Sequence, residues 1–432
     1  MSLKSKTISG VKWTTFSTIA LALVGILKIS VLARFLDAAD FGLMALVTFV
    51  LGFMDLFMDM GLTSAILHKQ EISRNEYASL YWINVIFSFI LFTLICLASP
   101  FIGAFYNEAE LVVLIPIVAI SIILSALGRQ FKTIEQKQLN FKYIAITDIV
   151  GAAIGLVVAI VTAMKGFGVY ALIYGALIQY AISNGIYFIN GLRERGLILH
   201  YSYNETKPFF KIGIYQVGGQ VVNYFNRDLD ILLIGKFFGS EILGGYSLAK
   251  QLVKRPMQIL NPIISKVATP VFAILQKDKQ QLKIKFLSFL NTVATINFIA
   301  YVMLALLAYP AVLVLYGKEF LDITLLVQIL SVYMFLRSVG SPVGSLLTAT
   351  GRTDMDLYWN LFVLLVTPIA IYIAAQYSIE LVALSMLMTS LILLYPFWRL
   401  LIFKLCGATA REFFLSFVPR FGRVYSLVKF IY

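Results

Sequence analysis

Long apolar stretches follow one another along almost the whole chain, and this succession constrains the fold more than any other feature. Composition agrees, because 60% of the 432 residues are hydrophobic and only 13% are charged, whereas soluble proteins carry about 25% charged residues. A helix crosses the hydrocarbon of a bilayer with about 20 apolar residues. The sequence therefore predicts an all-α membrane protein with about twelve transmembrane helices. Their expected positions are 10–33, 41–67, 79–105, 111–128, 143–164, 169–190, 208–235, 243–274, 286–310, 322–348, 356–376 and 380–404.

The basic residues divide unequally between the two sides of this arrangement. The side that holds the N-terminus carries 24 Lys and Arg residues in its links and chain ends, while the opposite links carry only Arg34, Lys165, Lys236 and Lys318. Segments rich in Lys and Arg remain in the cytoplasm. Both termini are therefore predicted to be cytoplasmic. The same asymmetry explains the net charge of +13 without a nucleic-acid partner.

The chain contains an internal repeat. Residues 34–46 align without gaps on residues 236–248, and a weaker match pairs 105–106 with 315–316. The positions that coincide in the first match are Phe35 with Phe237, Gly42 with Gly244, and Leu46 with Leu248. Two halves of the same orientation predict a pseudo-twofold axis along the membrane normal, with the substrate path between the halves.

This repeat sets the expected domain organisation. We predict an N-terminal six-helix lobe at 1–206 and a C-terminal six-helix lobe at 207–405. Residues 406–432 mix basic and aromatic side chains and are too polar to span. They are predicted to form a basic cytoplasmic interfacial tail, broken at Pro419 and attracted to anionic lipid.

A polar stripe runs along the apolar segment 208–235. Its members are spaced by four, three, four and three residues, which places them on one face of a helix. They are Gln216, Gln220, Asn223, Arg227 and Asp230, and Asp228 flanks them. Such a stripe predicts the wall of a hydrated cavity, and a polar seam packed against another helix is the alternative.

The next segment, 243–274, carries cations in a similar pattern. Lys250 and Lys254 share a face, Arg255 lies beside them, and three prolines are expected to kink the helix. Charges at bilayer depth are costly and usually face a cavity or a partner, although long basic side chains can also snorkel to the interface. The predicted substrate-binding residues are Lys28, Asn223, Arg227, Lys250, Lys254, Arg255 and Arg337. This mainly cationic set favours an anion such as phosphate and disfavours a cationic drug.

Four aspartates accompany these cations. Asp55 and Asp59 lie one helical turn apart in 41–67, so they require a partner or a raised pKa. One hypothesis is that they pair with Lys254 and Arg255 and latch the two halves together. The alternative is that they exchange a coupling H+ or Na+. We assign Asp55, Asp59, Asp228 and Asp230 to ion coupling or to an inter-lobe gate.

The links on the outer side are all short, the longest being 311–321. A membrane polymerase or glycosyltransferase needs a folded segment to hold its catalytic groups, so the sequence disfavours an enzyme. The two histidines and two cysteines show no metal-ligand spacing. We therefore expect no cofactor and no metal.

Four phrases of the sequence resemble the polysaccharide transporter family of the multidrug, oligosaccharidyl-lipid and polysaccharide exporter superfamily, most of all exporters of the colanic-acid type. The phrases lie at 34–45, 59–65, 226–239 and 243–249, and the resemblance covers roughly 1–405. It implies two six-helix lobes and a flippase of the bacterial inner membrane. The implied cargo is a polyprenyl-diphosphate-linked oligosaccharide, moved by alternating access. The implied partners are the lipid bilayer, this lipid-linked glycan and polysaccharide polymerase or export machinery.

Two alternatives remain open from the sequence. A multidrug or cation antiporter of the same superfamily would be expected to have a net acidic cavity, whereas this set of intramembrane charges is net basic. A passive scramblase would differ from a flippase only in showing no dependence on an ion gradient.

Overall fold

The structure, a computed structural model, describes residues 3–59, 66 and 72–420. Within these residues every regular element is a helix. The chain forms two compact units, Met1–Gly244 and Gly245–Tyr432. We call them unit 1 and unit 2 and describe each by itself.

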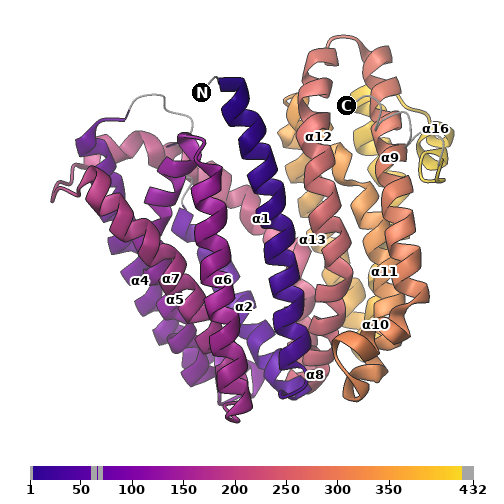
Figure 1. The fold of residues 1–432 in the computed structure, drawn as a ribbon. Helices are drawn as coiled ribbons and strands as arrows, with labels where there is room; N and C mark the ends of the chain where they lie inside the picture. The colour runs from indigo at the N-terminus through magenta and orange to yellow at the C-terminus, as the bar shows by residue number, and fades with distance from the viewer. Residues whose placement is uncertain (1–2, 60–65, 67–71, 421–432) are drawn as a thin grey trace. The chain divides into compact units, whose positions relative to one another are not determined.

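The described part of unit 1 contains six helices and the first part of a seventh, drawn from indigo to magenta in Figure 1. Within this unit α6 packs on α1 and α7, and α5 packs on α4 and α7. The bounds are α1 Leu3–Leu32, α2 Ala38–Asp59, α4 Arg74–Tyr106, α5 Leu111–Lys137, α6 Phe141–Met164, α7 Val169–Arg195 and the beginning of α8 Tyr203–Leu275.

Unit 2 contains the rest of α8 and the helices that follow it. Here α11 packs on α9 and α14, and α13 packs on α14. The bounds are α9 Lys279–Leu306, α10 Ala308–Leu315, the 3-10 helix η1 Lys318–Ile323, α11 Thr324–Val339, α12 Ser341–Ala349, α13 Thr353–Ala374, α14 Ile379–Phe397, the π-helical turn η2 Trp398–Ile402, α15 Phe403–Cys406 and α16 Ala410–Leu415.

Eleven helices among the described residues are long and apolar enough to cross a membrane. One of them, Val217–Pro262, has 46 residues, which at 1.5 Å per residue gives about 69 Å, more than twice the hydrocarbon thickness. Gly239 interrupts it with a φ of 78° and a ψ of −178°, a conformation that favours glycine. The whole of α8, Tyr203–Leu275, therefore contains the two predicted segments 208–235 and 243–274, so the eleven helices account for all twelve predicted spans.

Two details of the predicted helices differ in the structure. The segment expected at 322–348 is divided at Gly340 into α11 and α12, where Pro342 occupies the first turn of the second helix. The segment expected at 41–67 is helical as far as Asp59, and most of its remainder lies outside the described residues.

The beginning of α2 crosses the middle of α8 at two glycines. A Cβ on Gly42 would lie 1.8 Å from the carbonyl oxygen of Ser240, and a Cβ on Gly244 would lie 1.7 Å from that of Ala38. Both contacts obey the offset of the internal repeat, because 42 corresponds to 244 and 38 corresponds to 240. The crossing is therefore reciprocal, as expected for a local twofold axis between the repeats.

Close packing of α6 on α7 also depends on glycines. A Cβ on Gly151 would lie 2.0 Å from Ser183 Oγ, and one on Gly155 would lie 2.5 Å from the carbonyl oxygen of Gly175. The spacing of Gly151 and Gly155 is the small-residue pattern that lets membrane helices approach closely. It brings the polar residues of α7 up against α6.

The first part of the predicted interfacial tail is packed onto unit 2. Phe413 of α16 is fully buried in a cluster that includes Trp398, Leu282 and Phe286. Asn291 of α9 donates to the carbonyl oxygens of Ser416 and Val418 at 3.1 and 2.8 Å. The segment 407–420 is therefore part of the helix bundle, because Phe413 buries more apolar area in protein than an interfacial position would allow. Residues 421–432 lie outside the described residues.

A polar cluster fixes the segment between α7 and α8 against α4. Ser79 Oγ donates to Glu205 and accepts from the backbone N–H of Ser202 at 3.0 Å, while His200 Nε2 lies 3.1 Å from both carboxylate oxygens of Glu205. The hydrogen bond from Ser79, with that from His200, holds the pKa of Glu205 below its ordinary value.

Acid should release this segment. Since the pKa of Glu205 is lowered in the folded protein, its contribution is complete above the unfolded value and is lost as the pH falls through the lowered one. Ser79→Ala should speed amide hydrogen exchange at Ser202 about fivefold at neutral pH, the effect of losing one hydrogen bond, and should weaken the acid dependence. Thr93→Ala, exposed on the same helix, is the control. Equal exchange in both variants would contradict the assignment.

Candidate functional site

A polar pocket of about 460 Å³ lies within unit 1. Five of the membrane-spanning helices, α1, α2, α5, α6 and α7, contribute residues to its lining, and its basic residues belong to the side predicted to be cytoplasmic. Its lining consists of Leu21, Asp55, Ser125, Arg129, Lys132, Thr133, Gln136, Asp148, Gln179, Tyr180, Ser183, Asn184 and Tyr187. Only Leu21 among these is aliphatic, which is unusual for a lining built by helices that contact lipid.

Arg129 and Asp55 form one ion pair of the pocket. The guanidinium donates to the Asp55 carboxylate, and this contact links α5 to α2. Asp55 is exposed and Arg129 is half-buried. The sequence required a partner for Asp55 because Asp59 lies one helical turn away. Arg129, from the same unit, is that partner.

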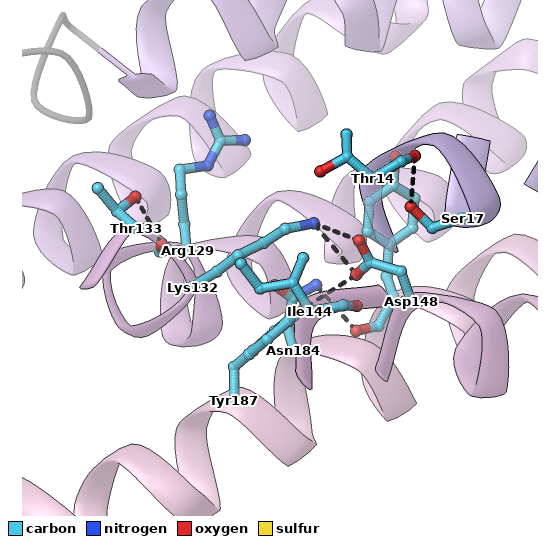
Figure 2. Close-up of polar contacts among 10 residues, drawn as sticks. Thr14, Ser17, Arg129, Lys132, Thr133, Ile144, Asp148, Asn184 and Tyr187 are labelled. Atoms are coloured by element: carbon cyan, nitrogen blue, oxygen red, sulfur yellow. Dashed lines mark hydrogen bonds and ion pairs between the residues drawn. The ribbon is translucent and has the colours of Figure 1, made fainter. Parts of the chain in front are cut away.

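Lys132 and Asp148 form the second ion pair, which joins α5 to α6 and is joined to α7 by Tyr187 (Figure 2). Lys132 Nζ lies 2.8 and 3.1 Å from the two carboxylate oxygens of Asp148. Tyr187 OH is 3.1 Å from Asp148 Oδ1 and 3.2 Å from the carbonyl oxygen of Ile144, and the ammonium lies 5.5 Å from the centre of the Tyr187 ring. Together these contacts connect α5, α6 and α7, which form three of the walls of the pocket.

Two uncharged residues of the lining are held by their own helices. Thr133 Oγ1 donates to the carbonyl oxygen of Arg129 at 3.0 Å, and Asn184 Nδ2 donates to that of Tyr180 at 3.0 Å. Gly128 lies opposite Asn184, where a Cβ would approach within 2.7 Å of the Asn184 Cα. α5 and α7 therefore touch beside the pocket, and this contact positions Asn184.

The cation of the predicted stripe on α8, Arg227, is exposed in unit 1. Asn223 and Arg227 are exposed, whereas Asp228 and Asp230 are buried. Arg227 Nε lies 2.6 Å from Asp228 Oδ2, and its guanidinium stacks 5.2 Å from the centre of the Tyr224 ring. Lys28, the other predicted cation of this unit, is half-buried on α1.

The remaining predicted cations belong to unit 2. Lys250 is 2% exposed, and Lys254, Arg255 and Arg337 are half-buried. Arg337 donates to the hydroxyl of Tyr333 at 3.1 Å. The structure thus distributes the predicted substrate-binding set over both units, and its role stays a prediction.

Of the predicted site residues, Asp55 alone lines the pocket of unit 1. The side chain of Asp59 lies outside the described residues. Arg129, Lys132 and Asp148 were not assigned to a site from the sequence, and the first two were counted among the 24 basic residues of the cytoplasmic links. A signal was present nonetheless: Ser125, Arg129, Lys132 and Gln136 are spaced by four, three and four residues, the same one-face pattern that marked 216–230.

Comparison with known proteins identifies the family. A family model described as polysaccharide biosynthesis protein matches residues 31–325. The lipopolysaccharide biosynthesis protein WzxC of Escherichia coli K12 is 31% identical over 417 residues, which are 96% of this chain and 85% of that protein. The teichuronic acid biosynthesis protein TuaB of Bacillus subtilis 168 is 28% identical over 375 residues, which are 87% of this chain and 78% of that protein.

Solved structures share the fold at low sequence identity. The lipid II flippase MurJ in an inward closed conformation has a TM-score of 0.73 at 15% identity, covering 98% of this chain and 91% of that one. An inward-facing multidrug transporter of the MOP superfamily has a TM-score of 0.68 at 14% identity, covering 91% and 100%. These likenesses confirm the predicted fold class, an all-α membrane protein with the fold that these two proteins share. Because the family model and the Escherichia coli relative both span most of the sequence, the chain belongs to the family of polysaccharide biosynthesis proteins, the polysaccharide transporters that its sequence resembles.

Proposed function

We propose that this protein is a flippase for a polyprenyl-diphosphate-linked oligosaccharide repeat unit, which it carries across the bacterial inner membrane by alternating access. Family membership supports this function, since the relatives are named for the synthesis of lipopolysaccharide and teichuronic acid. The shared fold of a lipid II flippase agrees with it.

The observation that carries the proposal is the polar pocket of unit 1. A lipid-linked glycan has a long apolar tail that is soluble in the bilayer and a polar head that is not. Its carrier must offer the head a polar chamber inside membrane-spanning helices. The pocket of about 460 Å³ supplies one, within the range of about 300–1,000 Å³ typical of small-molecule sites.

The cations outside the pocket are assigned to the diphosphate. In this proposal Lys28, Arg227, Lys250, Lys254, Arg255 and Arg337, with Asn223, contact the phosphates during passage, since guanidinium and ammonium groups suit phosphate oxygens. Asp55, Asp59, Asp228 and Asp230 couple the motion to H+ or Na+, or gate it. The protein performs no covalent chemistry, needs no cofactor, keeps both termini in the cytoplasm and hands its cargo to polymerase or export machinery.

Loss of the gene should trap the cargo inside the cell. We expect lipid-linked repeat units to accumulate and surface glycan to disappear, and the wild-type gene should reverse both effects. Arg227→Ala should raise the accumulated intermediate roughly tenfold, because a charge-assisted contact contributes about 1.5–3 kcal/mol. Arg352→Ala, which removes an exposed arginine paired with Asp354, is the matched control.

Extracted lipids and surface polysaccharide would be measured in the same cells. Normal surface glycan in the deletion strain would refute the flippase. Loss of cationic dye efflux in that strain, with glycan intact, would instead establish the antiporter.

A further inference from the structure

The charges of the pocket in unit 1 balance. Arg129 faces Asp55 and Lys132 faces Asp148, and the described residues of the lining include no other charged one, so their formal charges sum to zero. A diphosphate entering this pocket would find both cations already paired with carboxylates, so it would gain no net attraction to offset the water that it loses. Hydroxyl groups would meet no such cost, because they donate to carboxylates and accept from ammonium and guanidinium groups.

The uncharged lining offers further hydrogen-bonding groups. The side-chain amides of Gln136 and Gln179 line the pocket and make no hydrogen bond to another residue in the described part of the chain. Each amide combines donors with an acceptor, as a sugar hydroxyl does. Ser183 adds a hydroxyl group. The hydroxyl fits beside α6 only because residue 151 is a glycine, since a Cβ on Gly151 would lie 2.0 Å from Ser183 Oγ.

An aromatic ring completes the lining. Tyr180 and Tyr187 lie two turns of α7 apart and on one side of it, with Asn184 between them. Tyr187 is engaged by Asp148 and by Lys132 over its ring, whereas Tyr180 is 44% exposed. A flat ring with an apolar face and a polar edge suits a pyranose, whose axial C–H groups form an apolar face.

We propose that this pocket binds neutral sugar residues of the cargo and thereby selects the glycan, while the diphosphate is bound elsewhere. The inference rests on the proposed function, and it gives the pocket a separate role within it. Gln179 and Asn184 are the residues that contact the sugar, and the two ion pairs are its charged hydrogen-bonding partners.

Two probes separate the sugar from the diphosphate. Purified protein in detergent would be titrated with the free repeat-unit oligosaccharide, released from the organism's own surface glycan, and with sugarless undecaprenyl diphosphate. Binding would be followed by thermal stabilisation. Gln179→Ala combined with Asn184→Ala should weaken oligosaccharide binding at least tenfold, the effect of two lost hydrogen bonds, and leave the Kd for undecaprenyl diphosphate unchanged. Gln376→Ala, an exposed glutamine of unit 2, should change neither.

Each other outcome overturns the inference in a recognisable way. Equal weakening of both ligands would assign the pocket to the diphosphate. Unchanged oligosaccharide binding in the double variant, or no oligosaccharide binding by the wild type, would remove the sugar from the pocket. None of these results depends on accumulation of intermediates in the deletion strain. The proposed flippase function and the proposed sugar site can therefore be refuted independently of each other.

Discussion

Gly42→Ala and Gly244→Ala should each destabilise the protein by about 1–3 kcal/mol, the usual cost of overpacking, and should reduce transport with it. The new methyl group would lie 1.8 Å from the Ser240 carbonyl oxygen in the first variant and 1.7 Å from that of Ala38 in the second. The obstructing atoms belong to the backbone, so no side chain can rotate away and the two helices must separate. This cost exceeds the gain of about 1 kcal/mol from replacing glycine by alanine in a helix.

The control and the double variant make this prediction specific. Gly185→Ala, on α7 of the same unit, would meet nothing within 4 Å and should be neutral or slightly stabilising. Because both clashes occur at one crossing, separating the helices for one methyl group makes room for the other. The double variant should therefore cost less than the sum of the single ones. Denaturant unfolding in mixed micelles measures all four proteins, and additive losses would contradict the shared crossing.

Phe413→Ala should cost about 3–5 kcal/mol, as for other fully buried aromatic side chains. Its ring is 0% exposed and packs in the cluster with Trp398, Leu282 and Phe286. The adjacent Phe414 is 39% exposed, so Phe414→Ala should cost far less. Thermal unfolding of the purified variants compares the two.

The hydrogen bonds at the start of α16 should be retained in both the Phe413→Ala and the Phe414→Ala variants. Thr409 and Glu412 form a capping box at its start, and Lys283 lies 3.0 Å from Glu412. The Thr409 backbone N–H and the Lys283 ammonium lower the pKa of Glu412. If Phe413→Ala and Phe414→Ala destabilise equally, the segment 407–420 is an interfacial tail, as the sequence suggested, and not part of unit 2.

Most of the fold could be predicted from the sequence because a bilayer leaves few choices. Backbone groups in hydrocarbon must be satisfied within a helix, so apolar length alone located nearly every span. What apolar length cannot show is a break inside an apolar stretch. The division of α11 from α12 at Gly340 lies inside a stretch that is long enough in total for only one span. The packing of Phe413 was missed for a related reason, since one buried ring in a basic segment leaves no periodic pattern.

The candidate site was predicted less well. Asp55 was selected because two aspartates one turn apart in an apolar segment require an explanation. Arg129 and Lys132 lie near a helix end, where basic residues are common, and so carried no special signal. Their partners Asp55 and Asp148 come from other helices, and a pairing across helices depends on packing that the sequence does not show.

The clasp formed by Lys132, Asp148 and Tyr187 has a consequence for affinity. It fixes three walls of the pocket before any cargo arrives. The conformational entropy of these walls is therefore lost during folding, and its loss does not reduce the binding free energy of the cargo. A mobile wall would adapt its shape to many glycans. A wall that is fixed in advance binds tightly only those sugars whose stereochemistry matches its hydrogen-bonding groups. Discrimination between epimers of a sugar then requires no movement within unit 1.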